Sequence, residues 1–385
     1  MSHISFNKKG ISEEELLKEL EEFLKMDTSF SEGKILNSMC TEPHPIAKKA
    51  HALFINANLG NPGLYKGTAE MERRVVSFLA QLLHGEKVEG HILSGGTESN
   101  ITAIYTARNL TGKKEVIFAE SAHFSVSKAL NFLAMKGQVL PLDENYLFSV
   151  EALKEVITKK TALVFCVAGT TELGLVDPVD EICAVASDYG VPVHVDAAFG
   201  GFVLPFLENE ERPVFDFRNE GVFSISVDPH KMGLSTIPSG ALLMRDKRYL
   251  KKGAVDSPYL THTKSYTILG TRSSAAVAAT YAVMRHLGLE GYKKIVERCM
   301  ENTKFLAEKV RSLGYELVVE PVTNLACIRL KNLERVKKRL EEMGWKLSVA
   351  RHPPSLRLVI MPHVRREMLV QFLEDFEAVA GEFEK

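Results

Sequence analysis

The chain of 385 residues lacks several features that mark common classes of protein. Its five cysteines form no C-x-x-C pair and its twelve histidines form no H-E-x-x-H pattern, so we expect buried free thiols and no catalytic metal ion. Neither sign of charge is in excess, because 48 basic residues face 49 acidic ones and leave a net charge of −1. This balance argues against nucleic acid or an anionic membrane as the main partner.

Long apolar stretches are also missing. The opening sequence, MSHISFNKKG, lacks the apolar core of a secretory signal peptide. Nowhere is the sequence apolar over the roughly 20 residues that a membrane-spanning helix needs. We therefore predict a cytoplasmic protein that does not contact a membrane.

Short apolar strands alternate with helical segments between about residues 90 and 245. This alternation indicates an α/β fold with a mostly parallel central sheet covered by helices on both faces. Residues 12–26 predict a capped amphipathic helix, and the Pro-, Gly- and Asn-rich residues 41–68 predict an irregular stretch. The length exceeds that of one average domain. We predict an N-terminal helical segment over residues 1–55, a large domain over 56–287 and a small α+β domain over 288–385.

A lysine follows a strand and a proline-bounded turn in SISVDPHKMG, residues 224–233. Lys231 is placed there to bind the aldehyde of a carbonyl cofactor covalently, although lysines at strand ends are more often solvated. Upstream, the strand VPVHVD ends in Asp196 and small residues follow it. Pyridoxal phosphate enzymes need this pair, a lysine to hold the aldehyde and a carboxylate to keep the ring nitrogen protonated. A strand-end cap is the alternative for Asp196.

Residues 94–97, Ser-Gly-Gly-Thr, join an apolar strand to a segment with helical spacing. A strand, a glycine turn and a helix start together present free backbone N–H groups to a phosphate. Gly95 and Gly96 allow close approach of the backbone, and Thr97 can cap the helix and donate its hydroxyl. The segment has neither the dinucleotide-binding register nor a Walker loop. An ordinary glycine turn with a threonine cap is the alternative.

With SGGTESN, SAHFSVSKA, AGTTELG, HVDAAFGG and DPHKMG in this order, the chain resembles the fold-type I pyridoxal phosphate enzymes. Within them it looks most like the group II amino-acid decarboxylases, in particular the compact archaeal L-tyrosine/L-aspartate decarboxylases. The resemblance covers about residues 56–385. It implies pyridoxal 5'-phosphate as cofactor, a fold like that of the PLP-dependent transferases, and a homodimer whose site lies at the subunit interface.

The resemblance also implies roles for single residues. It assigns Lys231 to the covalent link with the cofactor and Asp196 to the pyridine nitrogen. His123 matches the histidine that stacks on the cofactor ring, a capped helix start being the alternative. The implied cofactor-binding residues are Gly95, Gly96, Thr97, His123, Thr171, Asp196, Ser226, Asp228, His230 and Lys231. Asp228 stands where many relatives carry asparagine, and a phosphate would repel that carboxylate unless it turned away.

Substrate residues are expected among the cationic side chains. Arg357, in SLRLVIMPH, resembles the arginine that meets the substrate carboxylate in many fold-type I enzymes, with a surface strand arginine as the alternative. His44, His262 and Lys264 are further candidates near the pocket. Tyr266 is the candidate for the tyrosine that returns a proton to the substrate carbon, and a packing role is its alternative.

The expected reaction is decarboxylation of an L-amino acid, with L-aspartate preferred, L-tyrosine next and L-glutamate possible. One rival is a carbon–carbon lyase of the sphingosine phosphate lyase type, which shares S-G-G-T-E-S and a His-Lys pair. That lyase would need a second anion site for its substrate phosphate. The other rival is a non-catalytic binding protein that retained the fold, against which the intact Lys231 and Asp196 argue.

Overall fold

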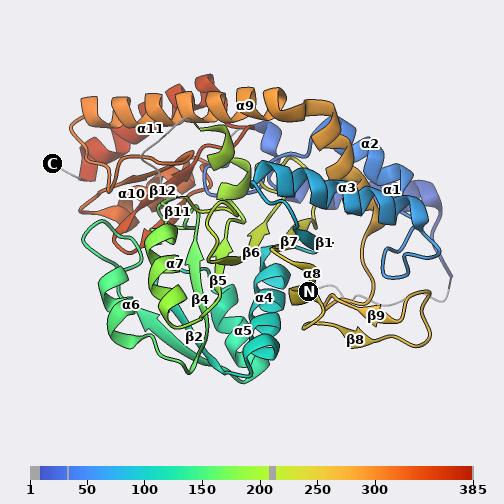
Figure 1. Ribbon diagram of the computed structural model, residues 1–385. Coiled ribbons are helices and arrows are strands. Elements are labelled where there is room, and N and C mark those ends of the chain that lie inside the picture. Colours follow the sequence, from blue (N-terminus) through green and yellow to red (C-terminus); the bar gives the residue numbers. More distant parts are fainter. Residues whose placement is uncertain (1–8, 33, 208–213, 384–385) are drawn as a thin grey trace.

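The computed structural model describes residues 9–32, 34–207 and 214–383. A seven-stranded sheet forms the centre, and a smaller three-stranded sheet lies beside the C-terminal helices (Figure 1). The central strands are β1 (Glu89–Leu93), β2 (Glu115–Ala119), β3 (Lys136–Leu140), β4 (Thr161–Val167), β5 (Val193–Asp196), β6 (Val222–Val227) and β7 (Gly240–Met244). Their order in the sheet is β1-β7-β6-β5-β4-β2-β3.

Strand directions bring several loops to one edge of this sheet. β3, β2, β4, β5 and β6 are parallel neighbours. β7 is antiparallel to both β6 and β1, so β1 runs in the same direction as β6. The carboxyl ends of β1, β5 and β6 therefore meet at one edge, where α/β proteins of this kind bind ligands. The predicted α/β fold with a mostly parallel sheet is confirmed.

Helices cover both faces of the sheet, as the alternating strand side chains require. Along β2, Val116 and Phe118 join one core, whereas Ile117 and Ala119 join the other. The helices around this sheet are α3 (Lys66–Leu82), α4 (Gly96–Thr111), α5 (Ser125–Leu133), α6 (Val150–Val156), α7 (Val179–Asp188) and α8 (Lys247–Leu250). Short elements complete this part: η2 (Gly200–Phe202), η3 (Leu204–Phe206), and the hairpin of β8 (Val255–Asp256) and β9 (Lys264–Ser265).

The N-terminal part begins with α1 (Glu13–Met26), followed by η1 (Phe30–Glu32) and α2 (Pro45–Leu53). The side chain of Ser12 accepts the N–H of Glu15, and the Glu15 carboxylate accepts the N–H of Ser12, which is the predicted capping box. Residue Leu36 is part of the small domain, because its carbonyl accepts the N–H of Val359 at 2.7 Å. This N-terminal residue therefore packs in the core of the C-terminal domain.

The small domain contains β10 (Leu325–Ile328), β11 (Ser348–Arg351), β12 (Pro354–Val359), α10 (Leu333–Glu342) and α11 (Arg366–Phe383). Helix α9 (Ser274–Ser312) leads into it and departs from helical geometry at Gly288, where φ is 58°. The predicted boundary between residues 287 and 288 falls on this kink. Residues 315–320 form no strand of this sheet, and Leu317 makes an isolated bridge with Ile328. Among the described residues, no helix is both long and apolar enough to cross a membrane.

Candidate active site

A cavity of about 330 Å³ opens at the sheet edge where β1, β5 and β6 end. Nine of the predicted residues line it: Gly95, Gly96, Thr97, His123, Thr171, Asp196, Asp228, His230 and Lys231. Asp196 ends β5, and the others lie in the segments that follow β1, β2, β4 and β6. The convergence follows from parallel strands whose carboxyl ends share one edge.

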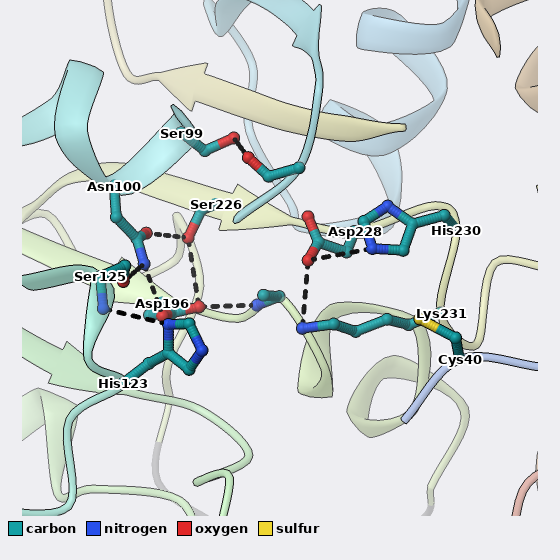
Figure 2. Close-up of polar contacts among 12 residues, drawn as sticks. Cys40, Ser99, Asn100, His123, Ser125, Asp196, Ser226, Asp228, His230 and Lys231 are labelled. Carbon is teal, nitrogen blue, oxygen red and sulfur yellow. Dashed lines mark hydrogen bonds and ion pairs between the residues drawn. The ribbon is translucent and has the colours of Figure 1, made fainter. Parts of the chain in front are cut away.

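Lys231 reaches into this cavity from the turn after β6 (Figure 2). Its Nζ lies 3.1 Å from Oδ2 of Asp228, and the other carboxylate oxygen of Asp228 is buried without a hydrogen-bond partner. Burial disfavours the charged amine, but the carboxylates of Asp228 and Asp196 outweigh it and raise the pKa of Lys231. The amine is therefore held as a cation until a reaction partner takes its proton.

Asp196, the last residue of β5, is surrounded by hydrogen-bond donors. The Asn100 side-chain amide donates to Oδ2 at 2.7 Å, and the backbone N–H of Ala198 donates to Oδ1 at 3.0 Å. The Ser226 hydroxyl lies 3.3 Å from Oδ1 (Figure 2). A carboxylate that accepts several such bonds is stabilised in its charged form. Asp196 can thus offer a fixed negative charge to the cavity.

His123 forms part of the cavity wall. Its Nδ1 accepts the backbone N–H of Ser125 at 3.3 Å, and its ring centroid lies 3.9 Å from that of Phe124. Burial lowers the pKa of His123, although the charge of Asp196 opposes this effect. The imidazole is therefore neutral at neutral pH and presents an uncharged ring to the cavity.

The turn after β1 has the geometry of an anion site. Gly95 has a φ of 153° and Gly96 is the first residue of α4, so the N–H groups at this helix start have no partner within the helix. A Cβ added to Gly96 would lie 3.0 Å from Oδ2 of Asp228 and 3.1 Å from Cβ of Ala198. The turn therefore needs glycine and can approach a phosphate closely.

These residues fit pyridoxal phosphate. The amine of Lys231 suits its aldehyde, the charge of Asp196 suits a protonated ring nitrogen, and the turn at Gly95 and Gly96 suits its phosphate. When bound, the cofactor supplies an electron-withdrawing ring that accepts the electron pair of the bond being broken. The chain itself contributes the amine, the fixed charge and the phosphate cradle, and it keeps the ring of His123 uncharged.

Ser226 does not line the cavity, although we predicted it as a phosphate donor. It faces the interior side of Asp196, and its hydroxyl lies 2.8 Å from Oδ1 of Asn100. Ser226 on β6 pairs directly with Asp196 on β5, and the Asn100 amide and the Asp196 carboxylate occupy its hydroxyl.

The predicted substrate residues Arg357 and His44 also lie outside the cavity lining. Arg357 donates to the carbonyls of Thr171 at 2.6 Å and Asn37 at 3.1 Å, and to the hydroxyl of Ser348 at 3.0 Å. Its guanidinium therefore holds the small domain against the large one. His44 is the N-cap of α2, where its Nδ1 accepts the N–H of Ile46.

Tyr266 occupies a separate pocket beside β9. Its ring stacks on His91 at a centroid distance of 5.7 Å. His262 and Lys264 line the same pocket, together with the buried pair of Glu72 and Arg272. A role for Tyr266 in proton return at Lys231 of the same chain is not supported by this position.

Sequence reasoning missed the residues behind Asp196. Asn100 also donates to the Ser125 hydroxyl, and its carbonyl oxygen faces Nε2 of His194 at 3.1 Å. The other ring nitrogen of His194 lies 2.7 Å from the Ser224 hydroxyl. One signal was present, since polar residues alternate with apolar ones in both β5 and β6 even though both strands are buried.

Replacing Gly96 by valine should weaken pyridoxal phosphate binding by about tenfold or more while the fold is retained, since a lost set of charge-assisted hydrogen bonds has this magnitude. The added side chain would displace Asp228 and Ala198 from the turn. Titration of the apoprotein with the cofactor measures the effect. Gly67→Val is the control, because nothing lies within 4 Å of a Cβ there. Equal affinities of the Gly96 variant and wild type would show that the turn is only structural.

His194 should make the stability of the apoprotein depend on pH. Burial lowers the pKa of His194 to about 4, from an ordinary value of 6.5. As pH falls from about 6.5 to 4, the unfolded chain binds a proton that the folded chain does not, so stability falls, by on the order of 3 kcal/mol. Denaturant unfolding of wild type and His194→Gln checks this. The variant should lose less stability over this interval, and parallel curves would contradict the expectation.

Three comparisons with known proteins agree with this site. A sequence model described as the pyridoxal-dependent decarboxylase conserved domain matches residues 3–331. The chain is 44% identical over 377 residues to a probable L-tyrosine/L-aspartate decarboxylase of Methanothrix thermoacetophila, with 97% of each chain covered. It is 45% identical over 382 residues to an L-aspartate decarboxylase of Thermococcus kodakarensis, covering 97% of this chain and 99% of the relative.

A solved structure, the sphingosine-1-phosphate lyase of Burkholderia pseudomallei, has a TM-score of 0.92 to this chain at 25% identity. That match covers 99% of this chain and 93% of the lyase. The resemblance expected from the motifs is confirmed, and with it the cofactor pyridoxal phosphate. A carboxy-lyase activity also agrees with the lysine and the carboxylate that share the cavity. The chain belongs to the pyridoxal-dependent decarboxylase family.

Proposed function

We propose that the protein removes the α-carboxylate of L-aspartate as carbon dioxide and releases β-alanine. The observation that carries this proposal is a single cavity containing Lys231 and Asp196, in a chain 45% identical to an L-aspartate decarboxylase over nearly its whole length. Residues such as His44, His262, Lys264 and Arg357 do not line that cavity, so the preference for aspartate rests on the relatives.

In this proposal each side chain performs one task. Lys231 binds the cofactor aldehyde through its amine and later moves protons at the substrate nitrogen and carbon. Asp196 keeps the proton on the ring nitrogen, which makes the ring an effective electron sink. His123 supplies an uncharged ring against which the cofactor can lie. Residues Gly95, Gly96, Thr97 and His230 hold the phosphate end.

A direct assay tests the substrate. Purified protein saturated with pyridoxal phosphate is given L-aspartate, L-tyrosine, L-glutamate or D-aspartate, and carbon dioxide and amine products are measured. We expect the highest kcat/KM with L-aspartate, β-alanine as product, and none from D-aspartate. Faster turnover of L-tyrosine or L-glutamate would contradict the substrate assignment and leave the decarboxylase reaction intact.

A second candidate reaction is cleavage of a phosphorylated amino alcohol. The structural similarity to a sphingosine-1-phosphate lyase is the observation that favours it. Such a substrate needs a second phosphate site, and the cationic residues Lys264 and Arg272 beside β9 are already paired with Asp256 and Glu72. Aldehyde release from a phosphorylated amino alcohol, without carbon dioxide, would establish this reaction in place of decarboxylation.

We further infer that the protein is a homodimer. Helix α1 supports this, because none of its residues is buried and Leu17, Phe23 and Leu24 are 53%, 56% and 71% exposed. Phe124 is also exposed where it lines the cavity. Clustered apolar side chains of this kind are covered by a second chain in symmetric oligomers. Location in the cytoplasm stays a prediction from the sequence.

Sedimentation equilibrium should therefore give twice the chain mass. The substitution Leu20→Asp, on the apolar side of α1, should raise the dimer dissociation constant about tenfold or more, since a buried leucine contributes roughly 1.5–3 kcal/mol. Glu19→Lys in the same helix is the matched control and should leave the mass unchanged. A monomer at micromolar concentration, for wild type, would refute the dimer.

A further inference from the structure

A chain of buried polar side chains lies directly behind Asp196. Asn100 on α4, His194 on β5, and Ser224 and Ser226 on β6 are all shielded from solvent. Figure 2 shows Asn100 on the side of Asp196 that faces away from Lys231, with Ser226 above Asp196. Buried polar side chains destabilise the folded state unless each has a hydrogen-bond partner. The donors and acceptors in this group can therefore be assigned from their positions.

The partners of Asn100 leave only one orientation for its amide. Its Nδ2 faces two oxygens, Oδ2 of Asp196 at 2.7 Å and Oγ of Ser125 at 2.9 Å. The opposite orientation would set the amide oxygen against the carboxylate, with no proton between them. The amide oxygen therefore faces Ser226 and His194, and it can accept from both.

This orientation in turn fixes the tautomer of His194. Since Nε2 lies 3.1 Å from the amide oxygen of Asn100, the proton of the neutral ring is on Nε2. Nδ1 then accepts from the Ser224 hydroxyl at 2.7 Å. The donors run in one direction, from Ser224 through His194 and Asn100 to Asp196. A hydrogen-bonded chain ordered in this way strengthens its terminal bond.

We propose that Asn100 is a positioning residue for Asp196: its amide, oriented by His194 and Ser226, holds the carboxylate charged and turned toward the ring nitrogen of pyridoxal phosphate. The inference rests on the role proposed above for Asp196. Asn100 donates to that carboxylate at 2.7 Å and the backbone N–H of Ala198 at 3.0 Å, while the Ser226 proton goes to the Asn100 amide oxygen. Without it, Oδ2 loses its amide donor, and the charge that the cofactor requires is no longer held in place.

A double-mutant cycle on cofactor affinity tests the proposal. Apoproteins of wild type, Asn100→Ala, Asp196→Ala and the double variant are titrated with pyridoxal phosphate, and thermal unfolding verifies that each is folded. We expect Asn100→Ala to raise the Kd about tenfold in the wild-type background. In the Asp196→Ala background the same change should raise it less than about twofold, because Asn100 acts through Asp196.

An equal loss of affinity in both backgrounds would overturn the positioning role, since Asn100 would then act independently of Asp196. If Asp196→Ala itself changes neither affinity nor turnover, the role of Asp196 is what fails. The control is Asn302→Ala, which removes another buried amide, bonded to the Val364 carbonyl at 3.1 Å and absent from the cavity lining. It should leave the Kd unchanged.

The isosteric substitution Asn100→Asp gives a second, independent measurement and keeps the volume of the side chain. At pH 8 the new carboxylate repels Asp196 and cannot donate, so the Kd relative to wild type should rise about tenfold or more. A Kd for Asn100→Asp within twofold of wild type would contradict the inference.

Discussion

Lys231→Ala should abolish carbon dioxide release, with a loss on the order of 10⁴-fold or more, because both the covalent attachment and the proton transfers depend on this amine. Purified wild-type protein should be yellow, and the variant should lose the absorbance of the covalently held cofactor. Borohydride reduction of the wild-type protein should attach the pyridoxyl group permanently to one lysine. Peptide mapping should identify that lysine as Lys231. The structure supports this site, because Lys231 Nζ reaches into the cavity beside Asp228.

Other lysines provide the controls for this expectation. Lys337, paired with Glu341 on α10, lies far along the chain from the cavity residues, and Lys337→Ala should keep colour and activity. A pyridoxyl group found on Lys128 or Lys264 after reduction would refute the assignment of Lys231. So would near-normal turnover of Lys231→Ala with saturating cofactor.

Asp196→Ala should reduce kcat by roughly a hundredfold or more, which corresponds to about 2.7 kcal/mol of barrier. The loss has an electronic cause, since the ring nitrogen would no longer keep its proton and the ring would withdraw electrons poorly. Stability should change much less than activity, because Asn100 and Ser226 can still bond to each other. Steady-state kinetics and thermal unfolding of the same preparations measure the two effects.

The conservative variant Asp196→Asn separates charge from shape. It fills the same space and can still accept the N–H of Ala198, but its NH2 group then faces the Asn100 donor, so thermal unfolding is measured alongside kcat. Its kcat should nevertheless be close to that of Asp196→Ala, because the missing element is the negative charge. Turnover of Asp196→Asn within threefold of wild type would rule out the electrostatic role.

Local sequence patterns predicted the fold and the cavity well for physical reasons. Alternation of short apolar strands with helices demands a covered parallel sheet, and strand-end residues such as Asp196 must then meet at one edge. The glycine turn at Gly95 and Gly96 follows β1 and opens α4, so it too lies at this edge. Other cavity residues, such as His123 and Thr171, were predicted from the family resemblance and not from a local pattern.

The predicted residues that lie outside the cavity lining have partners far away in sequence. Arg357 was expected near the substrate, but the carbonyls of Thr171 and Asn37 bind its guanidinium, and their approach depends on how the two domains pack. Ser226 was expected at the phosphate, but it does not line the cavity and its hydroxyl meets the amide oxygen of Asn100 on α4. Register and domain packing are global properties, so no local pattern could reveal them.

The pairing of the N-terminal segment with the small domain determines when this protein can finish folding. Asn37 donates to the carbonyl of Leu347, a contact that spans 310 residues of sequence. The ribosome makes the N-terminal segment long before residue 347, so this contact cannot form until most of the chain has been made. The sole tryptophan, Trp345, lies fully buried there against Phe372. The fluorescence of Trp345 therefore changes when the small domain around it folds.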